Sequence, residues 1–147
     1  MTTEDQDIID KARAILSRRV KRGAALSSPK AAQDYLALQL GEREAEVFCV
    51  LYLDNRHRLI EFREEFQGTI DGASVYPREI VKHALAFNAA AVILAHNHPS
   101  GIAEPSRADE MITGRIKAAL ALVDVRTIDH LIIAGGAVVS LAERGEL

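Results

Sequence analysis

The chain has 147 residues and a mass of 16.1 kDa, with 48% hydrophobic and 27% charged residues. This composition predicts one globular domain that needs neither a disulfide nor a metal to fold, and it excludes a disordered or collagen-like chain. A net charge of −3 argues against a protein whose main task is to grip a nucleic-acid backbone. The single cysteine, Cys49, and the lack of a long apolar segment indicate a cytoplasmic protein without membrane contact.

The first predicted element is an amphipathic helix over 7–22, whose second half carries a basic cluster, Arg18 to Arg22. These cations suit the negative end of a helix dipole, or they form a small patch for an anionic partner. Gly23 is expected to end this helix, and Ser28-Pro29 to begin the next one, over 29–40. We therefore predict an N-terminal arm over residues 1–27 and a main domain over 28–147.

From residue 47 the hydrophobic pattern changes to that of strands. A continuous apolar run over 47–53 predicts a strand buried on both faces, followed by a turn and a returning strand over 59–66. A helix over 77–88 with Leu85 inward, a buried strand over 89–95 and a helix over 106–122 follow. Two strands joined at a Gly135-Gly136 turn, which requires positive backbone angles, close the chain. This order predicts an α/β fold in which helices flank a mixed sheet.

The chemistry is expected where the second buried strand runs into His96-Asn97-His98. Residues two apart in extended backbone point to the same side, so both imidazoles can reach one point. Asp109, on the first turn of the next helix, is a candidate third ligand because the intervening loop is short. Two histidines and one aspartate leave a fourth tetrahedral position for water, as in catalytic zinc sites. The plainer interpretation is unligated histidines and an ordinary helix start capped by Ser106.

His-x-His, ten intervening residues and Asp, with Ser three residues before the Asp, resembles the JAMM metalloprotease motif of the MPN fold. His96, His98, Ser106 and Asp109 match that spacing without gaps. The run His-Asn-His-Pro-Ser-Gly over 96–101 resembles the RadC branch of this superfamily more closely, as do shorter segments elsewhere in 28–147. The resemblance implies a three-layer, cytidine-deaminase-like architecture. It also implies a short form without the N-terminal helix-hairpin-helix module of longer RadC proteins.

The same resemblance implies one zinc ion per chain, held by His96, His98 and Asp109, in a hydrolase of peptide or isopeptide amide bonds. It implies that Glu46 is the general base and that Ser106 donates a hydrogen bond to the oxyanion. Two other glutamates remain alternatives to Glu46. Glu44 would face the same side of an extended chain, and Glu79 follows Pro77 at a helix N-terminus.

Three further residues carry expectations. Asn97 stands where protease members of the superfamily commonly have Ser or Thr, which puts the substrate, rather than metal binding, in question. His130 is expected either to orient a metal ligand or to be packed in the core. Cys49 is expected to be buried and unreactive, because no basic residue adjoins it in the sequence.

Three functions follow from these patterns. The first is a zinc-dependent hydrolase that acts on an unidentified protein or peptide partner. The second is a nucleic-acid-associated factor in DNA repair, which the basic cluster Arg18 to Arg22 keeps open despite the net charge. The third is an inactive MPN-type scaffold. The complete set of motif residues, His96, His98, Ser106 and Asp109, argues against it.

Overall fold

The computed structural model describes residues 2–21, 26, 28–68 and 75–147, and it confirms the predicted α/β fold. Five strands form one mixed sheet in the order β2-β1-β3-β4-β5, in which β3 and β4 are parallel and the other neighbours are antiparallel. In chain order the elements are α1 (Thr3–Lys21), α2 (Pro29–Leu40), β1 (Val47–Leu53), β2 (Leu59–Gln67), α3 (Pro77–Ala86), β3 (Ala91–Asn97), α4 (Arg107–Ala121), β4 (Arg126–Ala134) and β5 (Ala137–Ser140).

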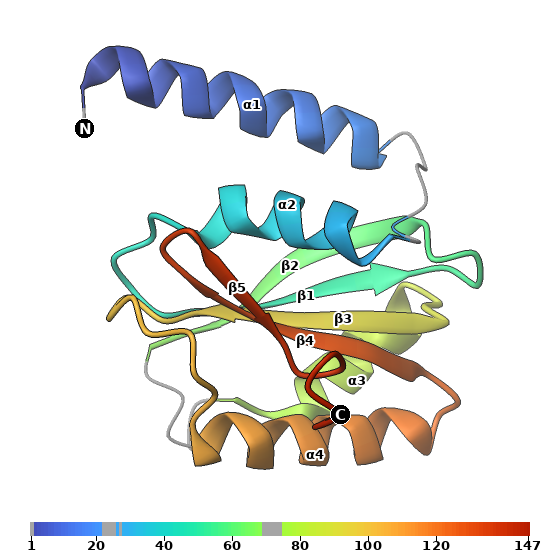
Figure 1. Ribbon diagram of the computed structural model, residues 1–147. Helices are drawn as coiled ribbons and strands as arrows, with labels where there is room; N and C mark the ends of the chain where they lie inside the picture. The colour runs from blue at the N-terminus through green and yellow to red at the C-terminus, as the bar shows by residue number, and fades with distance from the viewer. Residues whose placement is uncertain (1, 22–25, 27, 69–74) are drawn as a thin grey trace.

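Helices cover both faces of this sheet, so the domain has three layers (Figure 1). Helix α2 lies on one face, and α3 and α4 lie on the other. Helix α1 packs on the outer side of α2, where Arg13 Nε donates a hydrogen bond of 2.7 Å to the Leu38 carbonyl. Among the described residues, no helix combines the length and the apolar character needed to cross a bilayer.

Strands β1 and β3 supply two separate cores by alternation of their side chains. Every residue of both strands is buried, as the two apolar runs predict. On β1 the odd-numbered side chains pack under α2 and the even-numbered ones under α3 and α4. On β3, Ala95 belongs to the α2 side and Leu94 to the α3–α4 side. Because this alternation continues along β3, the side chains of His96 and Asn97 leave the strand in opposite directions.

Several element boundaries differ from the predicted ones for local reasons. Helix α1 begins four residues early because the Thr2 hydroxyl accepts a hydrogen bond from the Asp5 N–H at 3.0 Å, which caps its first turn. Helix α3 ends at Ala86 because Asn88 adopts a left-handed φ of 54°. The predicted burial of Leu85 is wrong, since this side chain is 58% exposed. The predicted helix end at Gly23 lies outside the described residues.

The ends of strand β3 and the last hairpin also depart from the prediction. Strand β3 ends at Asn97 rather than residue 95, because His96 and Asn97 still pair with Ile132 and Ile133 of β4. The turn between β4 and β5 uses a positive φ of 58° at Gly135, whereas Gly136 does not need one. The extension of β3 matters for function, since it places His96 inside the rigid sheet.

Cys49 lies at the centre of the α2-side core, which predicts a thiol that does not react in the native protein. Burial, reinforced by the nearby Glu64 carboxylate, raises the pKa of this thiol to about 12. We expect iodoacetamide to alkylate the folded protein about 100-fold or more slowly than the unfolded protein, because the thiolate is the reactive form. Mass spectrometry with and without guanidinium measures both rates. Equal rates would show that Cys49 is accessible in the folded state.

Candidate metal centre

Three side chains converge where strand β3 ends and helix α4 begins. His96 Nε2 lies 2.9 Å from His98 Nε2 and 3.0 Å from Asp109 Oδ1, and His98 Nε2 lies 3.2 Å from Asp109 Oδ2. His96 and Asp109 are almost completely buried, whereas the His98 side chain is 14% exposed. The sequence spacing therefore brings together the three residues expected to meet, and the cluster opens to solvent at His98.

The local backbone explains how a helix residue reaches two strand residues. The His98 N–H donates to the Ile133 carbonyl at 2.7 Å, which holds the end of β3 against β4. Gly101, with a φ of 84°, then turns the chain away from the sheet. Helix α4 starts with a capping box: Ser106 Oγ accepts from the Asp109 N–H at 3.0 Å, and Asp109 Oδ2 accepts from the Ser106 N–H at 2.7 Å.

A chain of buried hydrogen bonds behind the cluster fixes the tautomer of His96. Thr113 Oγ1 lies 2.6 Å from the Asp109 carbonyl, which can only accept, so the hydroxyl donates there. The same hydroxyl must then accept from Nδ1–H of His130, its other close neighbour. Neutral His130 consequently accepts at Nε2 from His96 Nδ1–H, over 2.7 Å. When His96 is neutral, as metal binding requires, its Nε2 therefore carries a lone pair directed at His98 and Asp109.

One hydrogen bond determines which nitrogen of His98 faces the cluster as an acceptor. Its Nδ1 lies 2.8 Å from the Ile102 carbonyl and therefore donates to it, so in the neutral ring the lone pair is on Nε2. Two lone pairs and a carboxylate would repel one another at these separations unless a cation lay among them. Donor separations of 2.9–3.2 Å are close to the edge of a tetrahedron with zinc–nitrogen bonds of about 2.0 Å, which is about 3.3 Å. The donor set fits a tetrahedral metal ion.

The electrostatic setting keeps these groups in the protonation states that bind metals. Burial alone would raise the pKa of Asp109, but a positive charge and a hydrogen-bond donor at His96, together with the Ser106 N–H donor, hold it below its ordinary value; in the metal-loaded centre the ion would supply the positive charge in place of the proton. Burial, together with the charges of His96 and His98, lowers the pKa of His130 well below its ordinary value. Asp109 is therefore ionised and His130 neutral near pH 7, in agreement with the hydrogen-bond chain.

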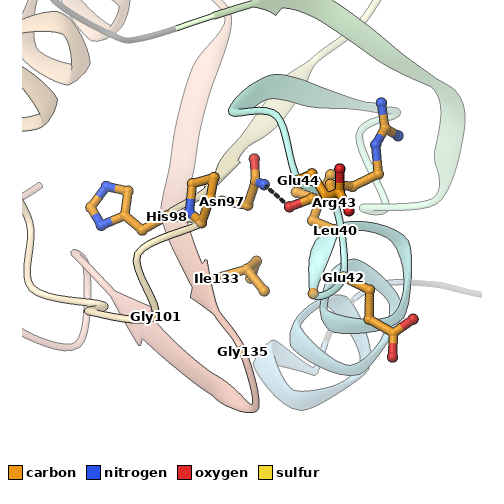
Figure 2. A pocket seen from close by; sticks show the side chains of 11 residues that line it. Leu40, Glu42, Arg43, Glu44, Asn97, His98, Gly101, Ile133 and Gly135 are labelled. Carbon is orange, nitrogen blue, oxygen red and sulfur yellow. Dashed lines mark hydrogen bonds between the residues drawn. The ribbon is translucent and has the colours of Figure 1, made fainter. Parts of the chain in front are cut away.

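Glu46 joins this cluster from the segment that connects α2 to β1. One of its carboxylate oxygens and one ring nitrogen each of His96 and His98 lie within 4.8 Å of one another, a group that could hold a metal ion. The two alternative glutamates lie elsewhere. Glu44 lines a pocket beside His98 (Figure 2), and Glu79, in the first turn of α3, forms an ion pair of 3.4 Å with Lys82.

Three residues near the centre have contacts that the sequence left open or did not indicate. His130 is buried in the core, as one interpretation expected, and it is hydrogen-bonded to His96; that it orients a metal ligand stays a prediction. Thr113 was not expected to take part, although its position four residues after Asp109 places it one turn along the same face of α4. This four-residue spacing is the feature of the sequence from which the part played by Thr113 could have been predicted. Phe48, also unforeseen, stacks on His96 with 6.1 Å between ring centroids and packs edge-on against His130.

Comparison with known proteins agrees with this geometry. A family model described as "RadC-like JAB domain" matches residues 26–146. The chain belongs to the RadC-like JAB domain family. This membership confirms the resemblance seen in the sequence. The family match begins just before α2, so helix α1 lies outside the matched region of this RadC-like JAB domain.

The RadC-like JAB domain also resembles longer bacterial proteins named UPF0758. It is 60% identical over 140 residues to one from Methylibium petroleiphilum, covering 95% of this chain and 63% of that protein. It is 58% identical to relatives from Aeromonas hydrophila and Nitrosococcus oceani, covering 97% and 99% of this chain and 63% and 65% of those proteins. The chain thus spans somewhat less than two thirds of the length of these relatives.

The hydrogen-bond chain predicts that Thr113 supports metal binding without touching the metal. The substitution Thr113→Val should weaken zinc binding about 10-fold, because His130 loses its acceptor and no longer orients His96. Competition against a chromophoric chelator measures the affinity. Thr127→Val is the matched control, since the buried Thr127 hydroxyl has no hydrogen-bond partner among the described residues. Equal zinc affinities for the two variants would contradict the role of Thr113.

Proposed function

We propose that this RadC-like JAB domain is a zinc-dependent hydrolase of peptide or isopeptide amide bonds. The observation that carries the proposal is the convergence of two imidazole nitrogens and one carboxylate at 2.9–3.2 Å. A cluster of this composition with solvent access on one side is typical of catalytic rather than structural zinc sites. The membership of this chain in the RadC-like JAB domain family supports the same assignment.

The distances support different roles for the two carboxylates. Asp109 contacts both histidine nitrogens at 3.0 and 3.2 Å, which suits a metal ligand. Glu46 is half-buried, and its carboxylate and the ring nitrogens of His96 and His98 lie within 4.8 Å of one another. A carboxylate at that position can reach a water molecule beside the metal and exchange protons with it. We therefore assign Asp109 as the third ligand and Glu46 as the general base.

The chemistry divides among a small set of groups. A zinc ion held by His96, His98 and Asp109 would supply Lewis acidity, lowering the pKa of a bound water to about 7. Glu46 takes the proton from the attacking water and returns it to the leaving amine, so one carboxylate serves as base and then as acid. Ser106 Oγ accepts a hydrogen bond from the helix and keeps its own hydrogen, which it donates to the developing oxyanion.

A pocket lies on the α2 side of the sheet, across strand β3 from the side chains of His96 and Asp109. It has a volume of about 400 Å³ and lies between His98 and the segment that follows α2, as Figure 2 shows. Leu40 and Ile133 form its apolar part, while Glu42 and Glu44 add carboxylates. Because the imidazole of His98 points away from this pocket (Figure 2), the pocket does not hold the bond that would be cleaved. We propose a protein or peptide as the partner of the metal centre.

The first test of the proposal is metal content. Protein purified without chelators should carry about one zinc ion per chain, which His96→Ala, His98→Ala and Asp109→Ala should each lose because each removes a donor. Inductively coupled plasma mass spectrometry measures the ratio. His57→Asn is the control, because it replaces a histidine in a turn at a left-handed φ that Asn tolerates. Ligand variants as rich in zinc as the parent would end the proposal.

The second test separates metal binding from catalysis. The isosteric change Glu46→Gln should keep the zinc and slow hydrolysis about 100-fold or more, because the amide cannot accept the proton. Rates are compared at equal zinc occupancy on a fluorogenic peptide library and on lysine-linked isopeptides. Glu79→Gln, which alters the glutamate paired with Lys82, should hydrolyse like the parent. Full activity in Glu46→Gln would place the base elsewhere.

The nucleic-acid alternative depends on the basic cluster Arg18 to Arg22, whose side chains lie outside the described part of the chain. No contact among the described residues favours this function over hydrolysis. The two functions separate by salt dependence, since binding to duplex DNA through these cations would weaken steeply as salt rises.

A further inference from the structure

Asn97 sits between the two zinc-binding histidines in sequence but faces the other side of the sheet. Its side chain is buried, at 2% exposure, against the segment that joins α2 to β1. There Oδ1 accepts from the Val47 N–H at 2.7 Å, and Nδ2 donates to the carbonyls of Ala45 and Arg43 at 2.9 and 3.3 Å. Figure 2 shows the amide directed at this segment while His98 points away from it.

These bonds lie where the backbone pairing of β1 with β3 stops. The last paired residues at this end are Phe48 and His96, and the backbone of Asn97 is paired with Ile133 of β4 instead. The side-chain amide of Asn97 supplies the hydrogen bonds that a neighbouring strand would otherwise give to this segment. Like a peptide unit, it carries one acceptor and one donor group. It therefore extends the hydrogen bonding of β1 by one further step toward its N-terminus.

The residue held by this arrangement is Glu46. The Asn97 amide binds the carbonyl of the preceding residue, Ala45, and the N–H of the following residue, Val47. The Glu46 carbonyl itself accepts from the Gly68 N–H at 2.8 Å. The backbone is thus fixed on both sides of Glu46, while the side chain is left to reach the histidines. A carboxylate that must exchange a proton needs such placement, since small displacements slow proton transfer.

We propose that Asn97 is a positioning residue that holds Glu46 over the metal centre; this rests on the proposed role of Glu46 as the base. A side chain with both a donor and an acceptor is needed to grip the segment on both sides of Glu46. Aspartate has the same shape but no donor for the Ala45 carbonyl, and alanine has neither group. Asn97 in this position consequently serves the base rather than the choice of substrate.

The test uses acetohydroxamic acid as a probe of the zinc-loaded protein, so no substrate is required. A hydroxamate binds zinc as its anion and passes its proton to a nearby carboxylate. Glu46→Gln should weaken its binding about 10-fold or more, the value of a charge-assisted hydrogen bond. Asn97→Ala and Asn97→Asp should each weaken it about 5-fold, because the carboxylate is present but displaced. Isothermal titration calorimetry measures all affinities, and chelator competition checks that zinc binding is unchanged.

The double variant decides whether Asn97 acts through Glu46. Adding Asn97→Asp to Glu46→Gln should cost no more than about 2-fold beyond Glu46→Gln alone, since contacting residues on one path are not additive. Tyr52→Phe is the matched control: it removes a partly buried hydrogen bond, to Glu65, at the other end of strand β1 from Val47. This control should bind the probe like the parent even where its melting temperature falls.

The outcomes distinguish the inference from the function on which it rests. If Glu46→Gln binds the probe as tightly as the parent, the proposed base is wrong and the inference about Asn97 falls with it. If Glu46→Gln weakens binding but both Asn97 variants do not, only the inference is overturned. Additive losses in the double variant, or a loss of zinc as large as in His96→Ala, would also overturn it. Asn97→Asp keeps the test decisive should Asn97→Ala fail to fold.

Discussion

The candidate metal centre depends on the alternation of side chains at the end of strand β3. A strand sends successive residues to opposite faces, and β3 remains a strand through Asn97. His96 consequently points under α4, where it meets Asp109 and His130, while Asn97 points toward the segment that carries Glu46. A shift of one residue in this strand would exchange the two faces and dismantle both halves of the site.

Burial of the donor atoms makes this centre favourable for a cation. Lone pairs on two imidazoles and a carboxylate are stable in a dry pocket only when a cation shares them, because an unpaired buried charge is costly. His130 and Thr113 supply the remaining hydrogen bonds, so each polar atom behind the ligands has a partner. The exposed edge at His98 is the part of the cluster open to solvent, as the proposed hydrolysis requires.

The sequence alone predicted the mixed sheet and the meeting of His96, His98 and Asp109, because strand alternation and helix capping are local rules. It did not predict Thr113, whose partner His130 is 17 residues away along the chain. It placed the end of β3 too early, since pairing with β4 extends the strand beyond its apolar run. The contacts of Asn97 also required the fold, because they join residues about 50 positions apart.

The hydrogen bonds behind the centre form a closed circuit that begins and ends on one residue. The Asp109 side chain meets His96, which leads through His130 and Thr113 back to the Asp109 carbonyl. A helix ligand and a strand ligand are thereby locked into one unit, and neither can swing aside while the circuit is intact. An ion bound in this centre would therefore enter and leave on the His98 side, which is open to solvent, without any movement of α4.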